Sequence, residues 1–385
     1  MFSLPIVSSG MWFSWSLLLL LVTWFCMFHS ALMIMEANLN FEPGASFDTF
    51  VKAILGKRWN TFNGVTLAFV LYILTYAYIS GGGSIVSHTL QSTLGVSLPP
   101  MLASLLFSLG LAFIVWYSTG LLGRMSTVLL GGMAVTFLLS VGDLTTQVQL
   151  PVLFESKLEY APFLLAAVPY YLASFGFHGC VPSMMKYYGK DPERIRKCLL
   201  YGSLLSLFVY LLWNIVTLGN IPRDQFKPIV AAGGNIGDLV SVLSGLSGSE
   251  NLPALLNAFA NMAVVSSFLG VTLGLFDYIS DLFGFDDSHL GRFKTALVTF
   301  LPPTIGGLFF PDGFIYAIGL AGLCGAAWGA LVPAMCAKVS REKFGNPHYR
   351  VWGGNGLIYF MFFYAALLIA CYTLAVLDIL PVFQA

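Results

Sequence analysis

Long apolar runs alternate with short polar stretches along the whole of this 385-residue chain. The runs long enough to cross a lipid bilayer as helices occupy residues 12–35, 62–80, 101–117, 121–141, 161–188, 199–218, 252–275, 295–310, 315–335 and 357–377. The pattern therefore predicts an all-α polytopic membrane protein with a single transmembrane domain, residues 1–385.

The composition agrees with a membrane protein. Hydrophobic residues make up 57% of the chain and charged residues 9%, and the mean hydropathy is +0.82. A net charge of zero gives no indication of a nucleic-acid partner. The six cysteines are scattered without a CxxC pair, so we interpret them as buried thiols rather than as disulfides or metal ligands. The first residues lack the basic stretch of a cleavable signal peptide.

Basic residues are distributed very unequally between the two sides that the ten runs define. One side carries fifteen Lys and Arg residues, and the other carries only Lys157, Arg223 and Lys227. Because cytoplasmic loops are enriched in Lys and Arg, the first side is predicted to be cytoplasmic. The C-terminus is then predicted to lie on the external side.

One apolar run, residues 161–188, is interrupted near its middle. It contains the sequence Ser174-Phe175-Gly176-Phe177-His178-Gly179-Cys180-Val181-Pro182. Gly and Pro free backbone groups that hydrocarbon cannot satisfy, so a lipid-exposed helix avoids such a cluster. In secondary transporters, broken helices of this kind hold the substrate near the middle of the bilayer. The interruption therefore favours a transporter.

The charge assignment requires the first run to cross from the external to the cytoplasmic side. We therefore interpret residues 1–5 as the second half of a first helix that is incomplete. Ser3-Leu4-Pro5 also echoes Gly179-Cys180-Val181-Pro182, and inverted repeats place broken helices at corresponding positions. We expect a five-plus-five repeat, with residues 1–141 and 161–335 as its halves and residues 355–380 as an extra helix.

Two shorter segments have helical periodicity. Phe47, Phe50, Val51, Ile54 and Leu55 follow the candidate cap Ser46, which predicts an amphipathic helix on the cytoplasmic surface. Residues 236, 239, 240 and 243 are apolar at the same spacing in the long loop 219–251. This second segment is interpreted either as a lid or as ordinary loop packing.

The chain also resembles the hydroxy and aromatic amino acid permease family, and most closely its tryptophan-type members. The matching stretches are residues 1–5, 29–30, 36–40, 72–80, 172–179, 187–191, 219–223, 263–278 and 351–354. The resemblance implies an eleven-helix, leucine-transporter-like fold in the bacterial inner membrane, with the C-terminus in the periplasm. It also implies tryptophan uptake by proton symport through alternating access. A tyrosine or broad-specificity aromatic permease is the alternative.

Two departures from this resemblance bear on mechanism. Family members carry about another half-helix upstream of Met1, including a Gly-rich turn. Related permeases also have a Lys in the fifth helix, where this chain has Met133. If that Lys serves proton coupling, transport here is either coupled through another group, coupled to Na⁺, or uncoupled. No other cofactor is expected.

A zwitterionic aromatic amino acid needs donors for its carboxylate, acceptors for its ammonium and a flat apolar slot for its ring. We assign the donors to Phe2 and Ser3. We assign the acceptors to the broken helix around Ser174, Phe175, Gly176 and Gly179. The ring-slot candidates are Phe175, Phe177, Tyr72 and Tyr76, although aromatic residues in membrane helices more often serve packing.

Four ionisable residues are candidates for proton coupling. His178 is the strongest, because an ionisable group inside a membrane is costly and imidazole titrates near neutral pH. A neutral histidine that binds a freed carbonyl is the structural alternative. His29 and Glu36 share one helix face, and Asp277 shares another with Asp281. Each of these is either a proton acceptor or a paired interfacial charge.

Ser266 and Ser267 are adjacent in the eighth predicted helix. Hydroxyl groups at such a place help to hold a coupling Na⁺ in the leucine-transporter-like fold, so these two serines form a candidate cation site. Small hydroxyl residues also allow close helix packing, which is the alternative.

An intramembrane enzyme is the main rival class. Gly245-Leu246-Ser247-Gly248 resembles a serine nucleophile motif, but it lies in a polar loop, and neither an HExxH motif nor a P-loop is present. We therefore predict a transporter and not an enzyme. Its predicted partners are an aromatic amino acid and the lipid bilayer, and no obligate protein partner is evident.

Overall fold

The computed structural model describes residues 1–43, 45–117, 119–246, 250–345 and 348–383, and within them it contains helices and turns but no strand. The helices are α1 (Ser3–Ser8), α2 (Trp12–Asn38), α3 (Phe47–Leu55), α4 (Lys57–Leu94), α5 (Pro100–Tyr117), α6 (Thr119–Thr145), α7 (Leu150–Leu153), α8 (Phe163–Ser174), α9 (Cys180–Tyr188), α10 (Pro192–Leu218), α11 (Phe226–Ala231), α12 (Ile236–Leu246), α13 (Leu252–Phe283), α14 (His289–Phe309), α15 (Phe314–Ala326), α16 (Val332–Phe344) and α17 (Gly354–Val376). Short 3₁₀ turns occupy Leu158–Tyr160 (η1) and Arg223–Gln225 (η2), and a π-helical turn, η3 (Ala327–Leu331), joins α15 to α16. The predicted all-α class is confirmed.

Eight stretches of helix in the described chain are long and apolar enough to cross a membrane: α2, α4, α5, α6, α10, α13, the continuous α15–α16 and α17. The other two predicted runs correspond to the discontinuous pair α8–α9 and to α14. Large apolar side chains such as Leu106, Val128 and Phe363 are exposed on the outside of this bundle. Exposed apolar surface of this kind is stable in lipid, and the chain is a polytopic membrane protein.

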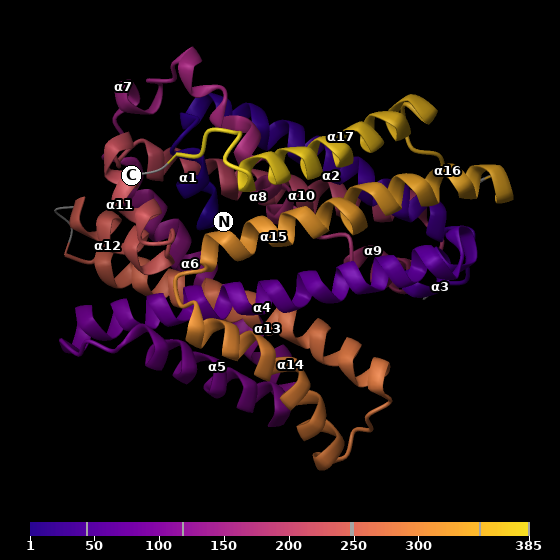
Figure 1. Ribbon diagram of the computed structural model, residues 1–385, viewed down its shortest axis with the longest axis horizontal. Coiled ribbons are helices and arrows are strands. Elements are labelled where there is room, and N and C mark those ends of the chain that lie inside the picture. The colour runs from indigo at the N-terminus through magenta and orange to yellow at the C-terminus, as the bar shows by residue number, and fades with distance from the viewer. Residues whose placement is uncertain (44, 118, 247–249, 346–347, 384–385) are drawn as a thin grey trace.

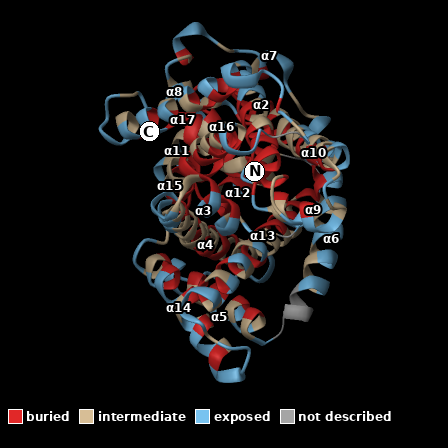
Figure 2. Cartoon of the chain, turned by 90° about the vertical axis from the view of Figure 1, so that its right-hand side faces the viewer, coloured by how far each residue is buried: buried red, intermediate tan, exposed pale blue. Residues whose placement is uncertain are grey.

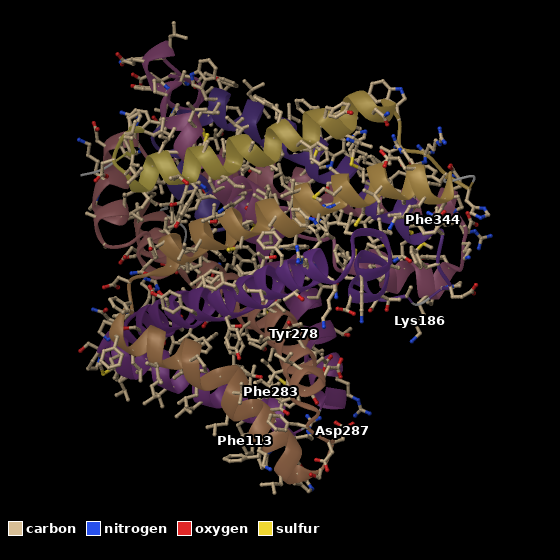
Figure 3. The ribbon with its side chains drawn as sticks, turned by 45° about the vertical axis from the view of Figure 1, so that its right-hand side comes forward. Phe113, Lys186, Tyr278, Phe283, Asp287 and Phe344 are labelled. Atoms are coloured by element: carbon tan, nitrogen blue, oxygen red, sulfur yellow. The ribbon has the colours of Figure 1, made fainter. Side chains whose placement is uncertain are left out.

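Short elements cover the two ends of the bundle. Helix α3 lies at one end with the ends of α9 and α16, whereas α7, α11 and α12 lie at the other (Figure 1). Figure 3 shows Lys186 of α9 and Phe344 of α16 at that first end. We call it the basic end, because it carries the Lys- and Arg-rich loops. We call the opposite end the lid end.

Both predicted amphipathic segments are helical. In α3 the Ser46 hydroxyl accepts a hydrogen bond from the Thr49 amide, and Phe50, Val51 and Ile54 are buried. Helix α12 buries Ile236, Leu239, Val240 and Leu243 at the lid end. Of the serine motif considered above, residues 247 and 248 lie outside the described residues.

Buried side chains form two clusters that meet at α1. One cluster is built on α4, α6, α10 and α13, and the other on α2, α8, α16 and α17. Phe2 and Ile6 belong to the first cluster and Leu4 to the second, so the two faces of α1 lie against different halves of the core. Figure 2 shows the buried residues gathered inside the bundle, with exposed residues along the outer helices α6 and α14.

Candidate functional site

A cavity of about 320 Å³ lies inside the bundle where α1, α4, α8 and α13 approach one another. We call it the central cavity, and the N-terminus marked in Figure 1 lies beside it. Its lining residues are mostly apolar: Met1, Phe2, Ser3, Leu74, Tyr78, Met133, Ala173, Ser174, Val209, Tyr210, Ile236, Ala263, Val264, Ser267, Phe314 and Ile318. A mostly apolar space of this volume inside a bundle, with a few polar groups, is typical of a small-molecule site.

The end of α8 brings a backbone acceptor to the central cavity. Helix α8 ends at Ser174 because Gly176 follows in the break and weakens the helix. The hydroxyl of Tyr210 donates to the Ser174 carbonyl at 2.7 Å, and the Phe175 ring lies edge-on to Tyr210 at a centroid distance of 5.3 Å. A carbonyl oxygen accepts two hydrogen bonds, so that of Ser174 can accept one more from a ligand.

Helix α1 forms the wall opposite this carbonyl. Phe2 is buried edge-on against Trp213, with ring centroids 5.4 Å apart, and Ser3 lines the cavity. The Ser8 hydroxyl and the Tyr171 hydroxyl lie 2.6 Å apart and join α1 to α8. The structure therefore places three of the predicted substrate residues, Phe2, Ser3 and Ser174, around one cavity.

Two hydroxyl groups line the cavity from α4 and α13. Tyr78 of α4 and Ser267 of α13 provide them. Met133 of α6 also lines the cavity. Ser266 does not line the cavity. Its hydroxyl donates to the Ala263 carbonyl of its own helix at 3.1 Å. The two adjacent serines predicted as a cation site therefore have different environments.

The start of α12 and the loop before it lie at the lid end of the cavity. Ile236, the first residue of α12, and Phe314 of α15 both line the cavity. The loop turns through Gly233 and Gly234, at φ +86° and +66°, where added Cβ atoms would lie 2.2 Å from Asp312 and Ile315 atoms. Only glycine fits these left-handed positions so close to α15, so the two glycines allow the loop to pack tightly there.

Tyr72 and Tyr76 lie outside the central cavity. Each donates its hydroxyl to α14 or to the residue that follows it: Tyr72 to the Val298 carbonyl at 3.0 Å and Tyr76 to the Phe310 carbonyl at 2.8 Å. These two tyrosines lie on the face of α4 that packs against α14. The tyrosines that line the cavity are Tyr78 and Tyr210, neither of which was a predicted site residue.

His178 is fully buried in the break between α8 and α9. Its ring lies edge-on to Trp328 of the π-helical turn at 5.6 Å and is stacked with Phe177 at 5.3 Å. Neither ring nitrogen of His178, nor the Trp328 indole nitrogen, has a hydrogen-bond partner among the described residues. Phe177, Gly176 and Gly179 surround this break but do not line the central cavity. Of the residues predicted in the broken helix, Ser174 thus lines the central cavity, whereas Gly176, Phe177, His178 and Gly179 lie in the break.

The other ionisable candidates are remote from the cavity. Glu36 is buried in a two-point ion pair with Arg341, at 2.5 and 2.8 Å, and accepts from the Val351 amide at 2.7 Å. His29 Nδ1 lies 2.8 Å from a carbonyl of its own helix. Asp277 is exposed near the basic end of α13. Glu36 therefore joins α2 to α16 as a structural pair.

Arg223 makes a contact at the lid end, although it was not among the predicted site residues. Arg223 donates to the Ser9 and Gly10 carbonyls, at 3.1 and 3.0 Å, where α1 turns into α2. Its guanidinium lies 4.0 Å from the Tyr160 ring centre and 4.4 Å from that of Phe383. In the sequence, Arg223 was one of three basic residues assigned to its side, and it ended the family-like stretch 219–223.

The chain is similar in sequence to known amino acid permeases. A sequence model of the group described as the tryptophan/tyrosine permease family matches residues 1–372. A tryptophan-specific transport protein of Pseudomonas aeruginosa is 56% identical over 387 residues, which cover 100% of this chain and 93% of that protein. A tyrosine permease of Enterobacter agglomerans is 40% identical, covering 100% of this chain and 94% of its own length.

A solved structure has the same fold. The crystal structure of MhsT in complex with L-phenylalanine matches with a TM-score of 0.58 and 15% sequence identity, over 97% of this chain and 94% of that one. The predicted leucine-transporter-like fold class is confirmed. The five-plus-five repeat and its boundaries stay predictions.

Proposed function

Because this chain belongs to the tryptophan/tyrosine permease family, we propose that it imports aromatic amino acids across the bacterial inner membrane, with tryptophan as its main substrate. The observation that carries this proposal is the central cavity, which is mostly apolar and has polar groups at its walls. The Pseudomonas aeruginosa relative at 56% identity and a Shigella flexneri relative at 54% are both named tryptophan-specific transport proteins. In this proposal the basic end is cytoplasmic, and the C-terminus lies in the periplasm.

The cavity residues suggest how tryptophan would bind. The substrate ammonium would donate to the Ser174 carbonyl, and the carboxylate would accept from Ser3 and its backbone amide on α1. The indole ring would then lie among Leu74, Val264 and Ile318. Apolar walls of this kind provide most of the affinity for an aromatic ring, whereas the polar ends fix its orientation.

The Tyr78–Ser267 pair supports tryptophan over phenylalanine. A hydroxyl group on this wall could accept the indole N–H, which phenylalanine lacks. A site that hydrogen-bonds a substrate group discriminates strongly against the analogue that lacks the group. Tyrosine also carries a donor, which keeps a tyrosine or broad-specificity permease as the alternative.

Access to the cavity would alternate between the two ends. We infer that Ile236 and Phe314, which line the cavity, close the path at the lid end. Helix α12 joins α4 through the Gly237 amide, which donates to the Ser84 hydroxyl at 3.1 Å. Opening would require this short segment to move away from α4 and α15. We propose that substrate binding is the event that changes the balance between open and closed states.

Proton coupling through His178 is the second part of the proposal. A buried imidazole without a hydrogen-bond partner is unfavourable when charged and is neutral in this conformation. Movement at the α8–α9 break would admit water and allow protonation, so that the proton and the conformational change are linked. Coupling to Na⁺ is the alternative, and Ser267 supports it because its hydroxyl faces the cavity.

Uptake of labelled tryptophan into proteoliposomes tests the transport proposal. We expect saturable accumulation, competition by tyrosine weaker than that by unlabelled tryptophan, and an increase of roughly tenfold in KM for tryptophan in Tyr78→Phe with Ser267→Ala. The same double variant should leave phenylalanine competition nearly unchanged. Absence of saturable uptake by a folded wild-type protein would contradict the proposal.

A further inference from the structure

A large cavity lies on the lipid-facing side of the described chain, away from the central cavity. It is a groove of about 1060 Å³ between α4 and α14 that extends to the loop joining α14 to α15. Its walls include Phe69, Ile73, Pro303, Phe309 and Tyr316. The side chains of Phe309 and Tyr316 are 72% and 61% exposed. We call this feature the apolar groove.

Two of the tyrosines that line the apolar groove, Tyr72 and Tyr76, have their hydroxyl groups paired. Those of Tyr72 and Tyr76 donate to the carbonyls of Val298 and Phe310, so the rings alone contribute to the groove wall. The groove is also open beside α14, where Pro302 and Pro303 interrupt the helical hydrogen bonds. A long apolar surface between two bilayer helices suits a hydrocarbon chain.

A second cavity of about 400 Å³ adjoins the groove at the lid end. Here Asp238 of α12 and Asp312 of the α14–α15 loop line a space with Ser84 and His88 of α4. We call it the acidic cup. No Lys or Arg side chain lines the cup or the groove among the described residues. Both cavities share Asp312, which therefore lies at the junction of an apolar and an anionic surface.

A buried acceptor in the acidic cup lacks a donor. Asn235 is 5% exposed, and its Nδ2 donates to the Ala232 carbonyl at 2.9 Å and to Asp312 Oδ1 at 2.8 Å. Its Oδ1 is buried without a partner among the described residues. Burial and the negative charge of Asp312 raise the pKa of Asp238, and His88 opposes this only in part. The cup thus offers two carboxylates and a free carbonyl oxygen to a group that carries donors and positive charge.

We propose that the apolar groove and the acidic cup together bind a phospholipid with a primary-amine headgroup. One acyl chain lies in the groove between α4 and α14, and the ammonium lies in the cup between Asp238 and Asp312. The ammonium has three N–H donors, which match the two carboxylates and the Asn235 carbonyl oxygen. The hydroxyl groups of Ser84 and Ser241 line the cup and can donate to the phosphate.

The headgroup preference follows from charge and from the number of donors. A trimethylammonium headgroup has the same charge but no N–H donor, so it leaves the Asn235 oxygen unpaired. An anionic glycerol headgroup meets two carboxylates and is repelled. An apolar groove alone would bind all three lipids equally, so the preference for the amine distinguishes the cup from ordinary contact with the bilayer.

Lipid retention by the purified, delipidated full chain tests this proposal. Native mass spectrometry would compare phosphatidylethanolamine, phosphatidylcholine and phosphatidylglycerol with identical acyl chains, added at equal concentration. We expect phosphatidylethanolamine to be retained about fivefold better than phosphatidylcholine. Asp312→Asn should abolish this difference. Asp224→Asn, an exposed acid of the lid end outside both cavities, is the matched control and should preserve it.

A groove variant separates the two parts of the site. Phe309→Ser should reduce retention of all three lipids while leaving their ratio unchanged, because it alters the acyl-chain surface only. Equal retention of the three lipids by the wild type would overturn the proposal, and so would an Asp312→Asn variant with its preference intact. Displacement of the bound lipid by millimolar tryptophan would also overturn it, because the cup would then belong to a substrate path. None of these readouts depends on transport.

Discussion

The hydroxyl of Tyr72 donates to the carbonyl of Val298 at 3.0 Å. Residue 298 lies four positions before Pro302, whose nitrogen cannot provide the helical N–H that this carbonyl would otherwise accept. Tyr72 on α4 therefore replaces a hydrogen bond that the proline removes from α14. An unpaired carbonyl in a membrane is costly, so this contact stabilises the kinked helix against its neighbour.

Replacing Tyr72 by Phe should lower stability without changing substrate affinity. The variant keeps the ring but leaves the Val298 carbonyl unpaired, at a cost of about 1 kcal/mol. Unfolding of the purified protein in detergent measures this loss, and tryptophan KM in proteoliposomes provides the second readout. A large increase in KM with unchanged stability would instead place Tyr72 in the substrate path.

Replacing His178 by Gln should separate transport from its driving force. The amide is of similar size and fits the same space, but it does not titrate near neutral pH. We expect exchange of internal for external tryptophan to persist, whereas accumulation driven by an imposed proton gradient is lost. His29→Gln is the matched control and should retain both. Proton-driven accumulation by the His178 variant would exclude this imidazole as the coupling group.

The Glu36–Arg341 pair should be needed for stability and not for coupling. Arg341→Met leaves a fully buried carboxylate without its partner, which should destabilise the protein by roughly 3 kcal/mol or more. The double variant Glu36→Gln with Arg341→Met removes both charges and should recover much of that loss. Chemical unfolding of the three proteins measures the effect. Equal instability of the single and double variants would show that the ion pair itself is not the cause.

The raised pKa of Asp238 predicts a pH-dependent stability difference. A raised pKa means that the folded state favours the protonated Asp238 carboxyl group. The contribution of this group to the stability of the fold is therefore complete below the ordinary aspartate pKa of about 3.9. The contribution is lost as the pH rises through the folded-state value. Asp312 and His88 are the titratable groups that act on the Asp238 carboxyl group.

Asp238→Asn should therefore be more stable than the wild type at pH 7 and equally stable near pH 4. The thermal unfolding midpoint of delipidated protein, measured from pH 4 to pH 8, checks this difference. Asp224→Asn is the control, because this exposed residue lies away from the cup. A difference that is constant with pH would contradict the assigned titration.

Features with a local cause could be predicted from the sequence. The break after Ser174 follows from Gly176 and Gly179, and the start of α3 follows from the Ser46 cap. Both depend on residues within one or two helical turns of the feature. The membrane-spanning runs were equally evident, because hydrophobic length alone determines them.

Features that depend on how helices face one another could not be predicted. Tyr76 and Tyr78 are two positions apart, so they point about 200° apart around α4, and only the packed bundle shows which one meets the cavity. The partner of Glu36 is 305 residues away, at Arg341. Helical periodicity places residues on one face but does not say which neighbour that face meets.

Direct binding of labelled tryptophan to the purified protein tests the central claim, that substrate occupies the cavity between α1, α4, α8 and α13. Ala263→Phe would fill this cavity from α13, and Gly270→Phe is the matched control on an exposed part of the same helix, where an added Cβ meets nothing within 4 Å. The account predicts that the first variant folds but no longer binds tryptophan, while the second binds like the wild type. Wild-type affinity in a folded Ala263→Phe protein would contradict the account.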